Sequence, residues 1–85
     1  MCTMIAEKRE VAGAGTGAQG WCGLDHVYVT YDHPFELRQE HALNIDFVNE
    51  AAGPGARVAV ELTRESAEAL VEAIQGALRR AAEVE

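Results

Sequence analysis

The chain has 85 residues, of which 48% are hydrophobic, and it carries a net charge of −7. This length predicts a single domain over residues 1–85, near the lower size limit for burying a sufficient core, so we expect support from a second copy. The apolar fraction excludes a disordered chain, and the net negative charge argues against nucleic acid and anionic membrane surfaces as partners.

The N-terminal segment begins with Cys2 and leads into a candidate strand over residues 3–11. It lacks a basic region followed by a long apolar run, so we expect no signal peptide, no transmembrane segment and a cytoplasmic location. A structural disulfide between Cys2 and Cys22 is not expected in that compartment. Removal of Met1 would leave a thiolate and an amine on one residue, and the two groups could chelate an ion together.

Residues 12–20, AGAGTGAQG, are predicted to form a loop of small residues. Within them GTGAQG matches the G-x-G-x-x-G spacing of dinucleotide-binding turns, which requires a helix to begin at the last glycine. The sequence continues as WCGLDHVYVTYD, which is rich in β-branched and aromatic residues and is typical of a strand. We therefore expect no nucleotide here.

Three further strands are predicted over residues 24–33, 41–49 and 57–63, because apolar residues alternate along each of them. Pro34 ends the first of these strands, and Gly53 and Gly55 lie in the turn before the last. The alternation assigns one face of the sheet to Val27, Val29, Tyr31, Leu43, Ile45, Phe47, Val58, Val60 and Leu62.

Residues 63–85 predict a helix that begins at the capping residue Thr63. Its apolar residues form one stripe: Ala67, Leu70, Val71, Ile74, Leu78 and Ala81. The order β-β-β-β-α favours the α+β class, as a four-stranded antiparallel meander with the C-terminal helix packed on one face, so that the stripe forms core. The opposite face mixes polar and small residues, and we expect a homodimer through that face or through a sheet edge.

All three histidines lie in residues 24–50, a segment with six acidic residues and one arginine. His33 ends one predicted strand and His41 begins the next, so they should lie nearly opposite each other, and their parity points both towards the helix side. Cys2 and the helix start at Thr63 are expected at the same end of the sheet. The sequence therefore predicts a convergence of one thiol, two imidazoles and a helix N-terminus.

Three kinds of chemistry fit this predicted end. A thiolate and two imidazoles suit a divalent transition metal such as zinc or iron, with Glu36, Glu40 or Glu65 as outer ligands. Cys2 could instead be a thiolate nucleophile polarised by a histidine, or a small anionic ligand could bind the helix N-terminus and the imidazoles. The spacing matches no compact ligand motif such as paired CxxC or HExxH, so a purely structural role remains the alternative.

We expect structural roles for three residues outside this end of the sheet, His26, Trp21 and Cys22. His26 falls on the opposite face near Tyr28 and Asp46, where cross-strand polar pairing is expected. Trp21 is expected to cover an open edge of the core, and Cys22 to behave as a small hydrophobic residue.

Several blocks of the sequence, MCT, DHP, LNIDF and RVAVELTRESAEALVEAI, resemble a family of short bacterial proteins of unknown function. The resemblance spans essentially the whole chain and implies a soluble, single-domain bacterial protein, without implying an activity, a cofactor or a catalytic residue. The leading hypothesis is a protein that binds a metal or a small ligand through Cys2, His33 and His41. A homodimeric accessory module is the alternative, and a small metal- or thiol-dependent enzyme is the third.

Overall fold

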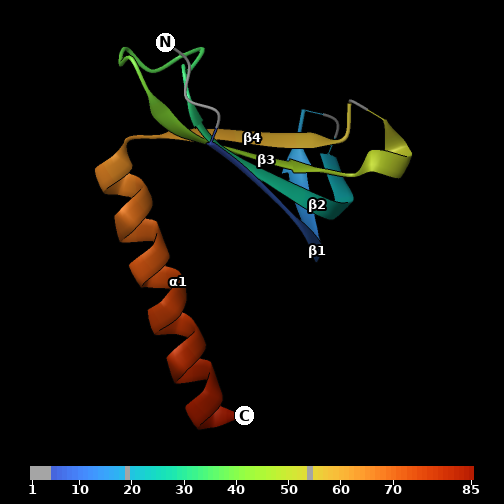
Figure 1. Ribbon diagram of the computed structural model, residues 1–85. Coiled ribbons are helices and arrows are strands. Elements are labelled where there is room, and N and C mark those ends of the chain that lie inside the picture. The colour runs from blue at the N-terminus through green and yellow to red at the C-terminus, as the bar shows by residue number, and fades with distance from the viewer. Residues whose placement is uncertain (1–4, 19, 54) are drawn as a thin grey trace.

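The computed structural model describes residues 5–18, 20–53 and 55–85. Four strands are followed by one helix: β1 (Ile5–Gly17), β2 (Gly20–Asp32), β3 (Ala42–Val48), β4 (Arg57–Leu62) and α1 (Arg64–Val84), with a short 3-10 turn, η1 (Glu50–Ala52), before β4. The strands form one antiparallel sheet in chain order (Figure 1). The predicted α+β class and the meander are confirmed.

The strand register aligns the predicted apolar rows. Leu43 of β3 lies opposite Tyr31 of β2 and Leu62 of β4. The same register places Ile45 opposite Val29 and Val60, and Phe47 opposite Val27 and Val58. Because side chains alternate between the faces of a strand, these rows lie on one face, which is the face that the sequence pattern predicts.

The predicted loop over residues 12–20 is wrong. β1 continues to Gly17 and β2 resumes at Gly20, with a shift in register between Glu10 and Gly13. A Cβ at Gly15 would lie 2.9 Å from the Leu24 side chain and 3.0 Å from that of Val58 in β4. The small residues therefore let β1 bend towards β4. Glycine allows the close approach of neighbouring strands here and does not end the strand.

Helix α1 leaves the sheet almost as soon as it begins (Figure 1). Thr63 alone separates it from β4, and the Thr63 hydroxyl caps the helix by accepting the Ser66 N–H at 3.1 Å. A single connecting residue is too short to fold the helix back over the sheet. The predicted packing of the helix on the apolar face is therefore confined to its first turns.

The exposure of the helix follows from this geometry. Ala42 and Ala67 are the only hydrophobic residues that are buried within the described ranges. Ile74 is 50% exposed and Leu78 is 66% exposed, so most of the predicted core stripe is open to solvent. No helix in the described part of the chain combines the length and the apolar character that crossing a membrane requires.

Candidate functional site

The side chains of His33 and His41 lie together at one end of the sheet. Asp32 and Ala42 are the last residue of β2 and the first of β3, and they pair with each other, so the two histidines flank that pair. Their rings stack with centroids 5.2 Å apart and an interplanar angle of 21°. Tyr31 stacks on His41 with a centroid distance of 5.7 Å. The juxtaposition that strand parity predicts is present.

The two imidazoles differ in their surroundings. His33 is exposed, whereas the Nε2 atom of His41 is buried and has no hydrogen-bond partner among the described residues. A buried polar atom without a partner is uncommon, because it loses its hydrogen bonds to water without replacement. Imidazole nitrogens are also common metal ligands, so this atom is the strongest sign of a ligand at this end.

Other chain segments reach the same end of the sheet. β1 starts with Ile5 opposite Tyr31, and β4 finishes with Leu62 opposite Leu43, directly before the cap of α1. Beside the helix start lies an apolar groove of about 540 Å³. The groove is lined by Ile5, Val29, Tyr31, Leu43, Arg64, Ala67, Glu68 and Val71.

The loop between the two histidines is anchored by Glu61 of β4. The Glu61 carboxylate accepts three consecutive backbone N–H groups, those of Phe35 at 2.7 Å, Glu36 at 2.9 Å and Leu37 at 3.0 Å. These three hydrogen bonds lower the pKa of Glu61 below its usual value, and the bond from the Phe35 N–H contributes most. On the His33 side, the Asp32 carboxylate accepts the His33 N–H at 2.8 Å. The position of the histidine pair therefore depends on a third strand.

Sequence reasoning missed Glu61. Its parity assigns it to the outer face of β4, where an acidic residue is ordinary, and nothing local links it to a loop more than twenty positions earlier. Three successive N–H groups around one anion form a concave anion-binding arrangement, but its formation depends on how the loop folds back.

The remaining predicted ligands do not join the histidine pair within the described residues. Glu36, Glu40 and Glu65 are exposed, and no group of three or more His, Cys, Asp or Glu side chains in residues 5–18, 20–53 and 55–85 could hold a metal ion. Cys2 lies outside the described residues. The described part of the site therefore consists of two imidazoles.

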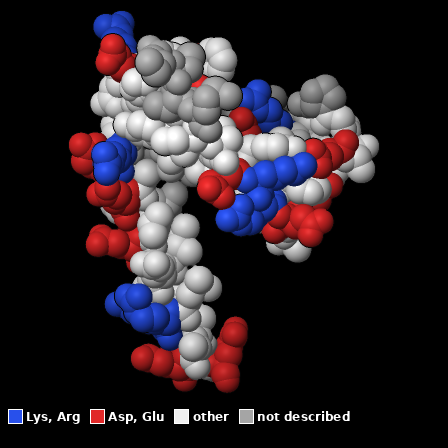
Figure 2. Space-filling view, viewed as in Figure 1, with Lys and Arg blue, Asp and Glu red and all other residues white. Residues whose placement is uncertain are grey.

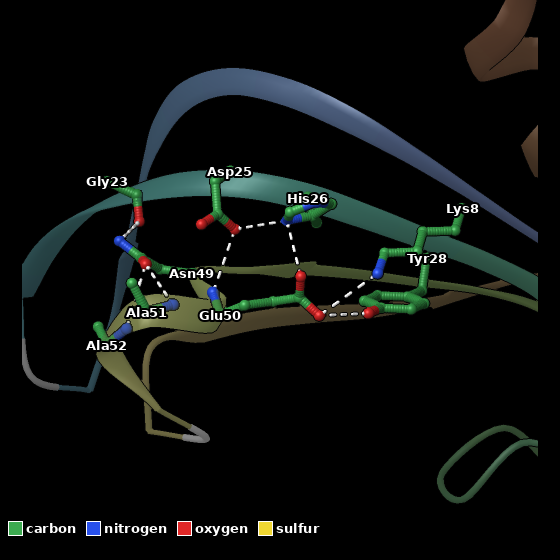
Figure 3. A network of polar contacts seen from close by, with 9 residues as sticks. All are labelled: Lys8, Gly23, Asp25, His26, Tyr28, Asn49, Glu50, Ala51 and Ala52. Carbon is green, nitrogen blue, oxygen red and sulfur yellow. Dashed lines mark hydrogen bonds and ion pairs between the residues drawn. The ribbon is translucent and has the colours of Figure 1, made fainter.

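A second polar cluster surrounds His26 on the other face (Figure 3). The His26 Nδ1 atom lies 2.9 Å from an Asp25 oxygen and 3.0 Å from a Glu50 oxygen. The second Glu50 oxygen accepts the Tyr28 hydroxyl at 2.6 Å and lies 3.5 Å from the Lys8 ammonium group. Asp46, which the sequence places near His26 and Tyr28, lies opposite Tyr28 and pairs across the strands with Arg57 at 2.7 Å.

This cluster fixes the turn after β3 to β2. Asp25 accepts the Glu50 N–H at 3.1 Å, while Asn49 caps η1 and donates to the Gly23 carbonyl at 3.0 Å. The hydrogen bond from His26 lowers the pKa of Asp25, and the bond from Tyr28 lowers that of Glu50. The bond with Tyr28 and the charge of Glu50 raise the pKa of Lys8. We interpret the cluster as a structural attachment, in keeping with the polar pairing expected on this face.

Trp21 and Cys22 show no sign of a site. Trp21 is 75% exposed and so does not cover a core edge as predicted. Cys22 is partly buried and has a free thiol.

Comparison with known proteins identifies the family. The chain belongs to DUF6295, a family of unknown function whose model matches residues 1–85. No curated protein and no solved structure matches the chain. The resemblance to a family without an assigned activity is thus confirmed, and the function must be argued from the geometry.

Proposed function

We propose that this member of a family of unknown function binds a divalent transition-metal ion, zinc or iron, through the paired imidazoles of His33 and His41, in the cytoplasm. The observation that supports this proposal is the buried Nε2 atom of His41, which has no partner among the described residues and belongs to a ring that stacks on His33. A coordinated ion would replace the missing hydrogen bond and would use both imidazoles as neutral nitrogen donors.

The proposed third ligand is Cys2. It precedes Ile5 by three residues, a span of roughly 10 Å at most in an extended chain. Ile5 pairs with Tyr31, two residues before His33. A thiolate with two imidazoles is a soft-to-borderline donor set that suits zinc or iron better than calcium or magnesium. Glu36, Glu40 and Glu65 are outer candidates for a fourth position, and a small anionic ligand is the alternative occupant.

The test is a metal titration of untagged protein, with intact mass to establish whether Cys2 is the N-terminal residue. We expect one equivalent of zinc per chain by elemental analysis, and its loss in the double variant His33→Ala, His41→Ala. Cys2→Ser should weaken binding by a smaller factor. His26→Ala is the matched control, because that histidine lies in the separate cluster with Asp25 and Glu50. Stoichiometric metal that persists in the double variant would contradict the proposal.

A second candidate, a homodimeric accessory module, is favoured by a different observation. Leu70, Val71, Ile74 and Leu78 leave between 40% and 66% of their surface exposed along one helix. Apolar stripes of this kind on a soluble chain mark interaction surfaces. Wild-type protein that sediments as a monomer at high concentration would contradict this candidate. The third possibility, a small thiol- or metal-dependent enzyme, depends on Cys2 and so on residues outside the described ranges.

A further inference from the structure

We propose that two copies of the chain pair their α1 helices antiparallel about a two-fold axis at Ile74, and that the last turn of each helix covers the groove beside the partner's sheet. This inference deepens the homodimeric candidate and does not depend on the metal site. It assigns the interface to the helix, whereas the sequence pattern favours a sheet face or edge.

The apolar stripe of α1 is symmetric about the middle of the helix. Ile74 is the central residue of Arg64–Val84. Leu70 and Leu78 lie four residues on either side of it, and Ala67 and Ala81 lie seven residues on either side. All five positions fall on one helical face, over a length of about 21 Å. When two such helices run antiparallel with Ile74 at the axis, these side chains meet side chains of their own size, while Val71, the sixth residue of the stripe, meets the smaller Ala77 of the partner subunit.

The distribution of charge along the helix favours the antiparallel arrangement. Arg64, Glu65, Glu68 and Glu72 give the first half of the helix a net charge of −2, and Arg79, Arg80 and Glu83 give the second half a net charge of +1. Figure 2 shows an uncharged band along the helix, with mostly red side chains beside its upper part, blue ones lower down and red ones again at its end. A parallel pair would place like charges together, whereas an antiparallel pair places the acidic half of one helix beside the basic half of the other.

The same symmetry fills the groove at the helix start. The groove lies between the sheet residues Ile5, Tyr31 and Leu43 and the first turns of α1. In an antiparallel pair the last turn of the partner helix arrives beside this first turn. Val84 in that last turn is 85% exposed, and Ile5 at the mouth of the groove is 57% exposed. One arrangement therefore covers both the helical stripe and the groove at the helix start, which a single chain of this size leaves open.

The first test measures the dimer dissociation constant by analytical ultracentrifugation. Ile74→Glu puts a charge on the axis and should weaken the dimer by more than about thirtyfold. The matched control Ala69→Glu adds the same charge on the opposite side of the helix and should leave the dimer intact.

The second test keeps the fold intact. Ile74→Cys, in a background with Cys2→Ser and Cys22→Ser, places two thiols at the axis and should form a disulfide-linked dimer in mild oxidant. Ala69→Cys in the same background should not. A dimer that survives Ile74→Glu and does not cross-link at position 74 would overturn the proposal in favour of a helix packed on the partner's sheet. A monomeric wild-type chain would overturn it as well, whatever the outcome of the metal titration.

Discussion

The rings of His33 and His41 stack 5.2 Å apart, although a loop of seven residues separates them in the chain. Two features hold them there: the pairing of Asp32 with Ala42 and the anchoring of the loop by Glu61. The sheet and the loop thus hold the pair in a fixed arrangement, as the proposed metal site requires.

Replacing His41 with phenylalanine separates a ligand role from a structural one. Phenylalanine keeps the stacked ring but removes the buried, unpartnered Nε2 atom. In the presence of a chelator we expect His41→Phe to be more stable than wild type by about 1 kcal/mol, as measured by urea unfolding. His33→Phe, at an exposed position, should show no such gain.

In the presence of zinc, the difference in stability between wild type and His41→Phe should reverse, so that wild type becomes the more stable protein. An ion that binds only the folded wild-type chain adds about 2.7 kcal/mol at a hundredfold excess over its dissociation constant. The His41→Phe variant should gain none of this. A variant that is less stable than wild type even in chelator would show that the His41 ring nitrogen serves the fold itself.

The Glu61 carboxylate should control the order of the loop. Glu61→Gln keeps the size of the side chain but removes the charge that three N–H groups share. We expect the amide protons of Phe35, Glu36 and Leu37 to exchange roughly tenfold faster in the variant. Hydrogen exchange followed by NMR measures this directly. Unchanged exchange at these three amides would mean that the loop is held by other contacts.

Stability should fall at both ends of the pH range. The folded-state pKa values of Asp25, Glu50 and Glu61 lie below their ordinary values of 3.8, 4.5 and 4.5. Their contributions are complete above those values and are lost as the pH falls through the lower folded values. The pKa of Lys8 is raised above 10.5, so its contribution is present below that pH and is lost as the pH rises further.

Urea unfolding at fixed protein concentration across this range is the measurement. We expect a plateau between about pH 5 and pH 10, with a decline on either side. Glu61→Gln and Asp25→Asn should each flatten the acid limb. Lys8→Met should flatten the alkaline limb and affect the acid limb only slightly, because the Lys8 charge is a minor cause of the lowered Glu50 pKa. An acid limb that stays equally steep in both carboxyl variants would contradict the assignment.

Much of the sheet could be predicted from the sequence because its signals are local. Alternating residues in β2, β3 and β4 determine the faces, and the same parity places His33 beside His41. Glu61 could not be found this way, since its three hydrogen bonds depend on the path of a loop whose sequence carries no periodic signal.

The course of α1 could not be predicted for a different reason. The stripe predicts an amphipathic helix correctly, but periodicity does not specify what the apolar side faces. Thr63 is the single residue between β4 and α1, so the connection directs the helix away from the sheet. The apolar stripe that the sequence assigns to the core of one chain is therefore also compatible with an interface between two chains.

The cap of α1 should be worth a measurable part of the stability. Thr63→Ala removes the hydroxyl that accepts the Ser66 N–H. We expect a loss of about 1 kcal/mol in the free energy of unfolding, and Thr63→Ser should retain most of it. Circular dichroism during urea unfolding checks both variants at one protein concentration. Equal stability of the alanine and wild-type proteins would mean that solvent satisfies the helix N-terminus.

Alanine substitutions at Gly13 and Gly15 test whether this glycine-rich segment is a packed strand or a free loop. A methyl group at Gly15 would meet Leu24 and Val58 at 2.9 and 3.0 Å, whereas one at Gly13 would have nothing within 4 Å. Neither residue has a positive φ, which in the described residues occurs only at Gly20 and Gly53. Gly15→Ala should therefore destabilise the protein by about 1 kcal/mol through overpacking, while Gly13→Ala should be neutral or stabilise it by up to about 1 kcal/mol.

Thermal unfolding of the two alanine variants and wild type makes the comparison. A free loop of small residues would respond alike at both positions, because alanine restricts an unfolded chain equally wherever it stands. A loss of stability for Gly15→Ala without a loss for Gly13→Ala requires that Gly15, and not Gly13, packs against a neighbouring strand. That contact brings β1 against β4 and thereby sets the curl of the sheet.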